Sequence, residues 1–152
     1  MQAVYRDDVE QLCAQAYELR EKFPPERALA EWLRLQMEYV LGKRGLGAAL
    51  IAALGRDSEL FAWSQDTLHA AAAALLTDAQ EAGMVRTDIN ATDLLRLGHS
   101  IGVSAGQSPL DAHRLLSVVL DGLRYPAPPI RPRFIVERST ISSRRCARRS
   151  RP

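Results

Sequence analysis

The chain has little cysteine, no long apolar run and no signal segment. Its only cysteines, Cys13 and Cys146, lie at opposite ends and share no metal-ligand spacing, which indicates free thiols in a reducing compartment. Apolar runs such as Ala70–Leu76 are far shorter than the roughly 20 residues that cross a bilayer. No basic segment followed by an apolar one opens the sequence, as a secretory signal would require. We therefore expect a cytoplasmic protein that has no membrane partner.

Residue patterns of catalytic and metal sites are also missing. Each of the three histidines, His69, His99 and His113, lacks a second histidine, cysteine or carboxylate four residues away, the spacing of a helical metal site. They are typical of surface or pocket histidines. Gly98–Gly102 match a Gly-x-Ser-x-Gly pattern, but they fall inside a predicted helix and not at the strand-to-helix turn that a nucleophile elbow requires. No glycine-rich phosphate loop follows a predicted strand. We predict no catalytic residue, no metal site, no cofactor and no enzyme activity.

What is abundant favours helices. Hydrophobic residues make up 47% of the chain, alanine and leucine dominate them, and β-branched residues are few. Apolar side chains recur at helical spacing between glycine and proline breakers. The sequence predicts an all-α domain of about six helices, over residues 3–19, 26–43, 46–54, 58–82, 90–105 and 109–123.

Glycines in the fifth predicted helix indicate a close contact. Gly98, Gly102 and Gly106 follow one another at intervals of four residues, along one face. Each interior glycine costs a helix about 1 kcal/mol relative to alanine. Such a stripe predicts that another helix or a ligand approaches closely. Gly106 has the simpler alternative of being the C-cap.

The sixth predicted helix is apolar over more than half of its circumference, through Leu115, Leu116, Val118, Val119 and Leu123. A helix that is apolar on two sides must be covered on two sides. In so small a domain a second subunit is the economical cover, and we therefore predict a homodimer.

A second apolar set allows two interpretations. Met37 and Trp63, with Trp32, Tyr39 and Phe61, are spaced along the second and fourth predicted helices. Such a set belongs to the core more often than to a cavity. The sequence leaves both interpretations open.

Charge divides the chain into two parts. Residues 1–125 carry 12 Lys/Arg against 17 Asp/Glu, a net charge of −5. Residues 126–152 carry eight arginines and one acidic residue, a net charge of +7, together with several prolines and serines. We predict a helical domain over 1–125 and a disordered Arg/Ser/Pro tail over 126–152.

Several segments resemble a known family in their order along the chain. They are Val4–Glu10, Asp57–Phe61, the turn Glu81–Asp88 and Asp93–Leu97. Together they resemble the C-terminal regulatory domain of TetR-family transcriptional repressors, over about residues 3–124. The resemblance implies a TetR C-terminal-like helical bundle that senses a ligand and dimerises.

The resemblance also assigns roles to particular residues. It implies an Ω-shaped homodimer in which the last two helices of each subunit form a four-helix bundle. Interface residues would be Gly102, Leu115, Leu116, Val119 and Leu123. It further implies a pocket among the second, fourth and fifth helices for a small, largely apolar ligand. The pocket would be lined by Met37, Trp63 and His99.

In that family a helix-turn-helix precedes this domain, and this sequence begins where such a module would already have ended. We therefore expect DNA binding only through an N-terminal module that is missing here, or weakly through the basic tail. An alternative function is a helical interaction module, without a ligand, that pairs with related full-length regulators.

The tail generates the first testable prediction. If residues 126–152 bind nucleic acid, they should do so weakly, without sequence preference, and with an affinity that falls steeply between about 50 mM and about 200 mM salt through counterion release. Gel shifts with random duplex DNA measure this for the full chain and for a chain that ends at residue 125. Equal binding by the two chains would show that the tail has no role.

Overall fold

The computed structural model describes residues 2–55, 57–105 and 108–124. This part is all-α, as predicted. Its helices begin and end within a few residues of the predicted bounds, although the first continues to Lys22 and the third already begins at Arg44. The helices are α1 (Gln2–Lys22), α2 (Pro25–Gly42), α3 (Arg44–Leu54), α4 (Glu59–Glu81), α5 (Ala91–Ser104) and α6 (Pro109–Arg124).

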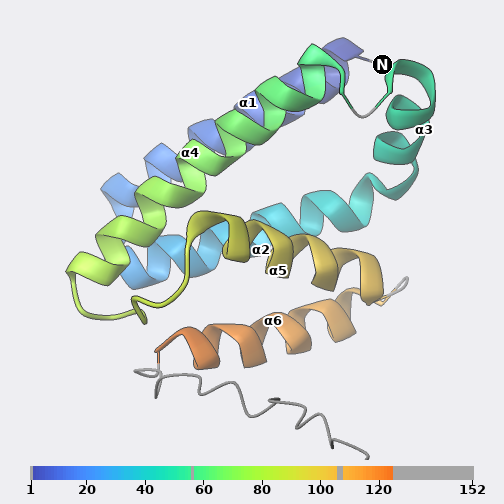
Figure 1. The fold of residues 1–152 in the computed structure, drawn as a ribbon. Helices are drawn as coiled ribbons and strands as arrows, with labels where there is room; N and C mark the ends of the chain where they lie inside the picture. The colour runs from blue at the N-terminus through green and yellow to red at the C-terminus, as the bar shows by residue number, and fades with distance from the viewer. Residues whose placement is uncertain (1, 56, 106–107, 125–152) are drawn as a thin grey trace, which may run out of the picture.

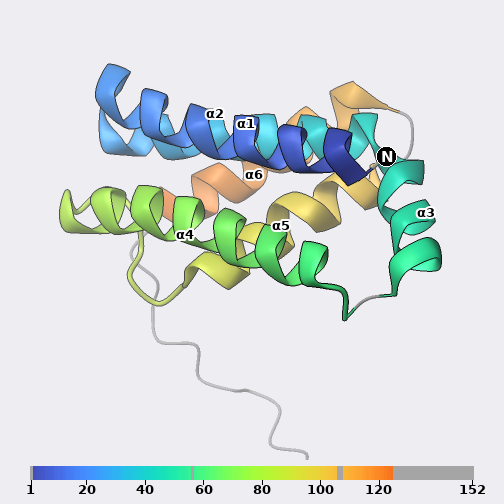
Figure 2. The ribbon, with the colours of Figure 1, turned by 90° about the horizontal axis from the view of Figure 1, so that it is seen from above.

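The helices are stacked in three layers (Figure 1). The long helices α1 and α4 run side by side in the first layer, and α2 packs against α5 in the second. Helix α6 lies on the far side of α2 and α5 from the first layer. The short helix α3 stands at the end of the bundle where the chain begins (Figure 2), and of its described side chains, those of residues 45–54, only Leu50 is fully buried.

The core is formed by α1, α2, α4, α5 and α6, and Trp32 is the largest fully buried side chain among the described residues. The Trp32 side chain is fully buried, and its indole Nε1 donates a hydrogen bond to the carbonyl of Leu12, 2.9 Å away. Buried indoles usually need such a partner. Leu29, Leu33 and Met37 continue the buried stripe of α2. Two members of the methionine and aromatic set, Trp32 and Met37, therefore belong to the core.

The predicted close approach at the glycines is confirmed, and the approaching element is α2. A Cβ atom at Gly98 would overlap the side-chain oxygen Oε1 of Gln36. One at Gly102 would lie 2.7 Å from Cγ1 of Val40 and 3.3 Å from the carbonyl oxygen of Met37. The missing side chains therefore let α5 lie directly on α2. Gly106 lies outside the described residues.

The turn between α4 and α5 holds the end of α6 in place. Gly83 has a φ of +71°, a conformation that other residues rarely adopt. The Gln80 amide donates hydrogen bonds to the carbonyls of Arg86 and Ile89, at 3.0 and 3.1 Å. The backbone N–H of Arg86 in turn donates to the carbonyl of Leu123 at 2.9 Å. The turn thus satisfies one of the carbonyls that the C-terminus of α6 leaves unpaired.

Side chains cap the N-termini of α5 and α6. Asn90 and Asp93 make a reciprocal capping box at α5, with both bonds 3.0 Å long. The hydroxyl of Ser108 accepts a bond from the backbone N–H of Asp111 at 3.3 Å. Ser58 occupies the N-cap of α4, but its side chain makes no capping bond.

The contact between α2 and α5 generates a stability prediction. Gly102→Ala should lower the free energy of unfolding by about 1–3 kcal/mol, because the branched Val40 side chain and the backbone of Met37 leave no room for a methyl group. Gly47→Ala is the matched control, since Gly47 lies within α3 and a Cβ there meets nothing within 4 Å. The control should be neutral or up to about 1 kcal/mol stabilising. Urea unfolding measures both, and equal effects of the two substitutions would contradict the close contact.

Candidate ligand-binding cleft

A cleft of about 510 Å³ opens between α4 and α5, with α2 beneath it. Its volume lies in the range of small-molecule sites. Helix α5 supplies most of the walls, α4 supplies the opposite side, and one residue comes from α2. The lining residues are Gln36, Gln65, Asp66, His69, Thr92, Leu95, Arg96, His99 and Ser100.

Gln36 of α2 is the buried polar residue of this cleft. It is only 5% exposed, and its Nε2 donates a hydrogen bond to the carbonyl of Leu95 at 3.3 Å. Its Oε1 lies against Gly98 and has no hydrogen-bond partner among the described residues. Buried acceptors without a partner are uncommon, since most buried polar atoms are hydrogen-bonded. Gly98 therefore makes room for an amide whose hydrogen-bonding capacity is not filled by the protein.

The charged and titratable residues of the cleft come in two pairs. Asp66 and His69 lie one turn apart on α4, and Arg96 and His99 lie one turn apart on α5. Residues three apart on a helix share a face. Each pair therefore presents its two side chains together, and the cleft holds one acidic residue, one guanidinium and two imidazoles.

The structure places one of the three predicted ligand residues at this cleft. His99 lines it. Met37 is fully buried in the core. Trp63 is half-buried and does not line the cleft, and the guanidinium of Arg6 on α1 lies 4.4 Å from the centre of its ring. Leu95 is the one apolar side chain that lines the cleft, so the lining is more polar than the sequence prediction of a largely apolar ligand implies.

The cleft residues that the sequence analysis missed carry only a weak signal. Asp66 and Arg96 are each followed by a histidine three residues later. That spacing is common on solvated helix faces. Only the meeting of α4 and α5 in space distinguishes these pairs from ordinary surface residues.

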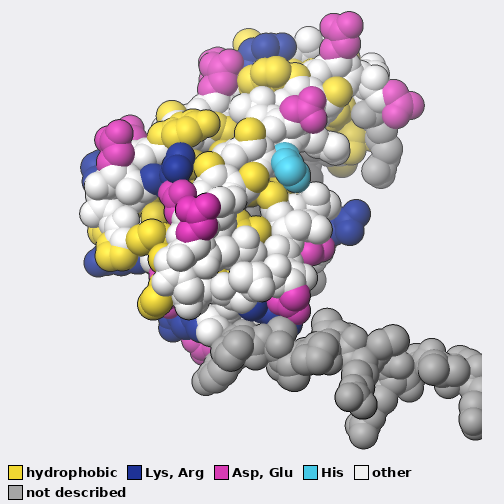
Figure 3. Space-filling view, turned by 60° about the vertical axis from the view of Figure 1, so that its left-hand side comes forward, with side chains coloured by type: hydrophobic (Ala, Val, Ile, Leu, Met, Phe, Trp, Pro, Cys, Tyr) yellow, Lys and Arg dark blue, Asp and Glu magenta, His cyan; other side chains and the backbone are white. Residues whose placement is uncertain are grey.

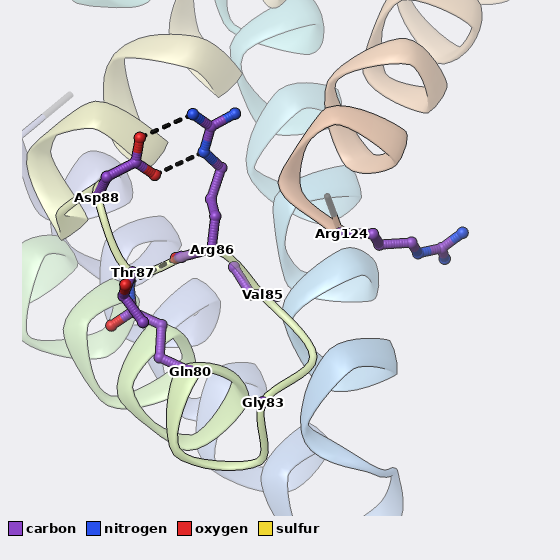
Figure 4. A pocket seen from close by; sticks show the side chains of 7 residues that line it. All are labelled: Gln80, Gly83, Val85, Arg86, Thr87, Asp88 and Arg124. Atoms are coloured by element: carbon purple, nitrogen blue, oxygen red, sulfur yellow. Dashed lines mark hydrogen bonds and ion pairs between the residues drawn. The ribbon is translucent and has the colours of Figure 1, made fainter. Parts of the chain in front are cut away.

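A second hollow, of about 330 Å³, lies at the turn between α4 and α5 (Figure 4). Arg86 and Asp88 form a two-pronged ion pair there, with distances of 2.6 and 2.7 Å. This hydrogen-bonded pairing raises the pKa of Arg86 and lowers the pKa of Asp88. Arg86 also donates a long hydrogen bond to the carbonyl of Gly122. These groups fill one another's hydrogen-bonding capacity. We therefore interpret them as a link that holds the turn against the end of α6, and not as a ligand site.

The predicted interface residues divide into internal and external ones. Leu116 and Leu123 are only 2% and 4% exposed, because α6 packs them against its own subunit. Gly102 is covered by α2. These three residues are therefore covered mainly by their own subunit, and their place in an interface stays a prediction. Leu115 is 40% exposed, and Val119 is half-buried.

Other exposed apolar side chains accompany Leu115 on the last two helices. Val118 is 66% exposed and follows Leu115 by one turn. The remaining large exposed hydrophobic residues of α5 and α6 are Leu97, Val103 and Leu110. We call these five residues the α5–α6 apolar surface.

The described part of the chain offers neither a metal site nor a membrane span. It contains no group of three or more histidine, cysteine or acidic side chains that could hold a metal ion. None of its helices is long and apolar enough to span a bilayer.

The buried thiol of Cys13 donates a hydrogen bond to the carbonyl of Thr67, and burial raises its pKa.

Comparisons with known proteins agree with this architecture. A family model described as "Transcriptional regulator SbtR-like, C-terminal domain", of the TetR class, matches residues 24–125. The crystal structure of the TetR transcriptional regulator SCO0520 from Streptomyces coelicolor superposes with a TM-score of 0.72 at 34% identity, over 83% of this chain and 73% of that one. No curated protein matches the chain.

The family match covers more than half of the chain, and its members are regulators and not enzymes, as expected from the sequence. The chain belongs to the TetR family of transcriptional regulators, and its described helices form the C-terminal regulatory domain.

Proposed function

We propose that this chain is a ligand-sensing and dimerising domain of a transcriptional regulator, and that the ligand binds in the cleft between α4 and α5. The observation that carries the proposal is the cleft itself, in which charged and polar side chains of α4 and α5 face a volume of about 510 Å³. DNA contact is left to an N-terminal module of the kind that the family carries.

The packing of the cleft walls supports a sensing role. Helix α4 forms one wall and also packs along α1, through the two-pronged Arg20–Asp78 ion pair and the stacking of Arg6 on Trp63. Helix α1 resembles the element that joins the family's DNA-binding module. A ligand that binds one spacing of α4 and α5 more tightly than another shifts the population toward that spacing. The shift would move α1 together with α4.

The lining revises the proposed character of the ligand. Small-molecule sites are mostly apolar, with a few polar groups that fix orientation. This cleft offers the side chain of Leu95 and many polar groups. We propose a small ligand that has an apolar body and at least one strongly polar group.

Dimerisation is proposed through the α5–α6 apolar surface. Val118 and Leu115 lie on the side of α6 away from Leu116, which faces the core. A second subunit that covered these exposed apolar side chains would remove them from water. The same surface would serve the alternative function, in which the chain binds no ligand and pairs with related regulators.

The ligand site is tested by thermal shift against a panel of metabolites. A ligand that binds only the folded protein stabilises it by about 2.7 kcal/mol at roughly 100 times its Kd. Ser100→Trp should abolish this stabilisation, because the indole would fill the cleft. Thr77→Trp is the control, since Thr77 is exposed on α4 and does not line the cleft. Stabilisation that survives Ser100→Trp would place the ligand elsewhere, and the absence of any stabilising compound would favour the pairing module.

The dimer is tested by light scattering on the full chain. Val118→Glu and Leu115→Glu should each weaken dimerisation by at least about tenfold in Kd, because a carboxylate would be desolvated in an apolar interface. Tyr17→Glu is the control, since Tyr17 is 54% exposed on α1 and lies outside the proposed interface. A monomer at tens of micromolar, or a dimer that neither substitution changes, would contradict the proposal.

A further inference from the structure

Arg96 differs from the other arginines whose side chains the structure describes. Each of those others has an ion-pair partner or lies over an aromatic ring. Arg20, Arg34, Arg86, Arg114 and Arg124 pair with carboxylates, and Arg6 and Arg27 lie over rings. Arg96 has neither kind of partner among the described residues, and it lines the α4–α5 cleft.

Local structure explains why Arg96 is left without a partner. The acidic residue one turn before it on α5 is Asp93, the position from which an acid would ordinarily pair with it. Asp93 is instead engaged in the capping box, where its carboxylate accepts a hydrogen bond from the backbone N–H of Asn90 at 3.0 Å. Asp66, the acidic residue of the opposite wall, makes no ion pair with Arg96. The guanidinium therefore remains available to a ligand.

The surroundings of Arg96 fit an anionic group. His99 lies one turn after it on the same wall, and Thr92 and Ser100 add hydroxyl donors. A guanidinium presents parallel N–H groups that match the two oxygens of a carboxylate. Leu95 supplies an apolar side chain beside them.

Only the charges within the cleft would attract an anion, because the net charge of the domain is negative. Residues 1–125 carry a net charge of −5. Figure 3 shows acidic side chains spread over one face of the molecule. Such a surface repels anions in general. Anion binding near Arg96 would thus depend on the cleft and not on the overall field of the protein.

We propose that the ligand of the α4–α5 cleft is a small organic carboxylate whose carboxylate pairs with Arg96 and whose apolar body lies against Leu95. This inference rests on the proposed function, and it names the chemical class that the site selects. Asp66 has the opposite effect to Arg96, because its negative charge repels the same carboxylate across the cleft.

Arg96 and Asp66 carry opposite charges, so substitutions that neutralise them should change carboxylate affinity in opposite directions. The probes are phenylacetate and octanoate, each compared with its neutral amide by isothermal titration calorimetry on the full chain. The carboxylates should bind more tightly than their amides. Arg96→Gln should weaken carboxylate binding by about tenfold or more, as expected for loss of a charge-assisted pair. Asp66→Asn should strengthen it by about twofold to fivefold, because a repulsion at partial solvent exposure is removed.

Arg34→Gln is the matched control, since Arg34 is an exposed arginine of α2 outside this cleft, and it should leave carboxylate binding unchanged. Circular dichroism establishes that each variant is folded. Amides that bind as tightly as the carboxylates, an unchanged Kd in Arg96→Gln, or weaker binding in Asp66→Asn would each overturn the carboxylate assignment. So would failure of both carboxylates to bind.

The proposed function is judged separately from this inference. A neutral or cationic metabolite that stabilises the protein, and loses its effect in Ser100→Trp, would leave the cleft as a ligand site while overturning the assignment of a carboxylate. The absence of any stabilising metabolite would count against both.

Discussion

The contact of α5 with α2 is the constraint on which the rest of the fold depends. Helices normally stay 8–10 Å apart because their side chains separate them. At Gly98 and Gly102 one helix has no side chains, so Gln36, Met37 and Val40 of α2 pack directly on its backbone. The position of α5 on α2 then determines the space that is left between α5 and α4, which is the cleft. It also sets the surface on which α6 packs.

The bounds of the helices could be predicted from the sequence because the features that set them are local. Proline and glycine breakers, the capping box of Asn90 and Asp93, and apolar spacing are all contained within a few residues of one another. The glycine stripe also predicted a close approach, since its cost in helix propensity requires compensation. It did not identify the approaching element. That choice depends on α2, about sixty residues earlier in the chain.

The interface and cleft were less accessible because neighbouring residues of one helix have opposite roles. Leu116 faces the core of its own subunit, and Val118, two residues later, faces outward. Because both residues are apolar, the sequence pattern does not distinguish Leu116 from Val118. Met37 likewise belongs to the core, although its type suits a pocket equally well. The cleft is lined by polar residues such as Asp66 and Arg96, whose pattern is ordinary on any solvated helix until two helices bring them together.

Helix α5 presents three different faces within fourteen residues. Gly98 and Gly102 face α2, Arg96 and His99 line the cleft, and Val103 with Leu97 belongs to the α5–α6 apolar surface. A rigid helix cannot move one face without the others, so a ligand that shifts α5 in the cleft also alters the surface offered to a partner. Coupling between two binding events is reciprocal in free energy. Under the proposed function, dimerisation would therefore change ligand affinity by the same factor by which the ligand changes dimerisation. The close contact at Gly102 leaves little room for α5 to move relative to α2.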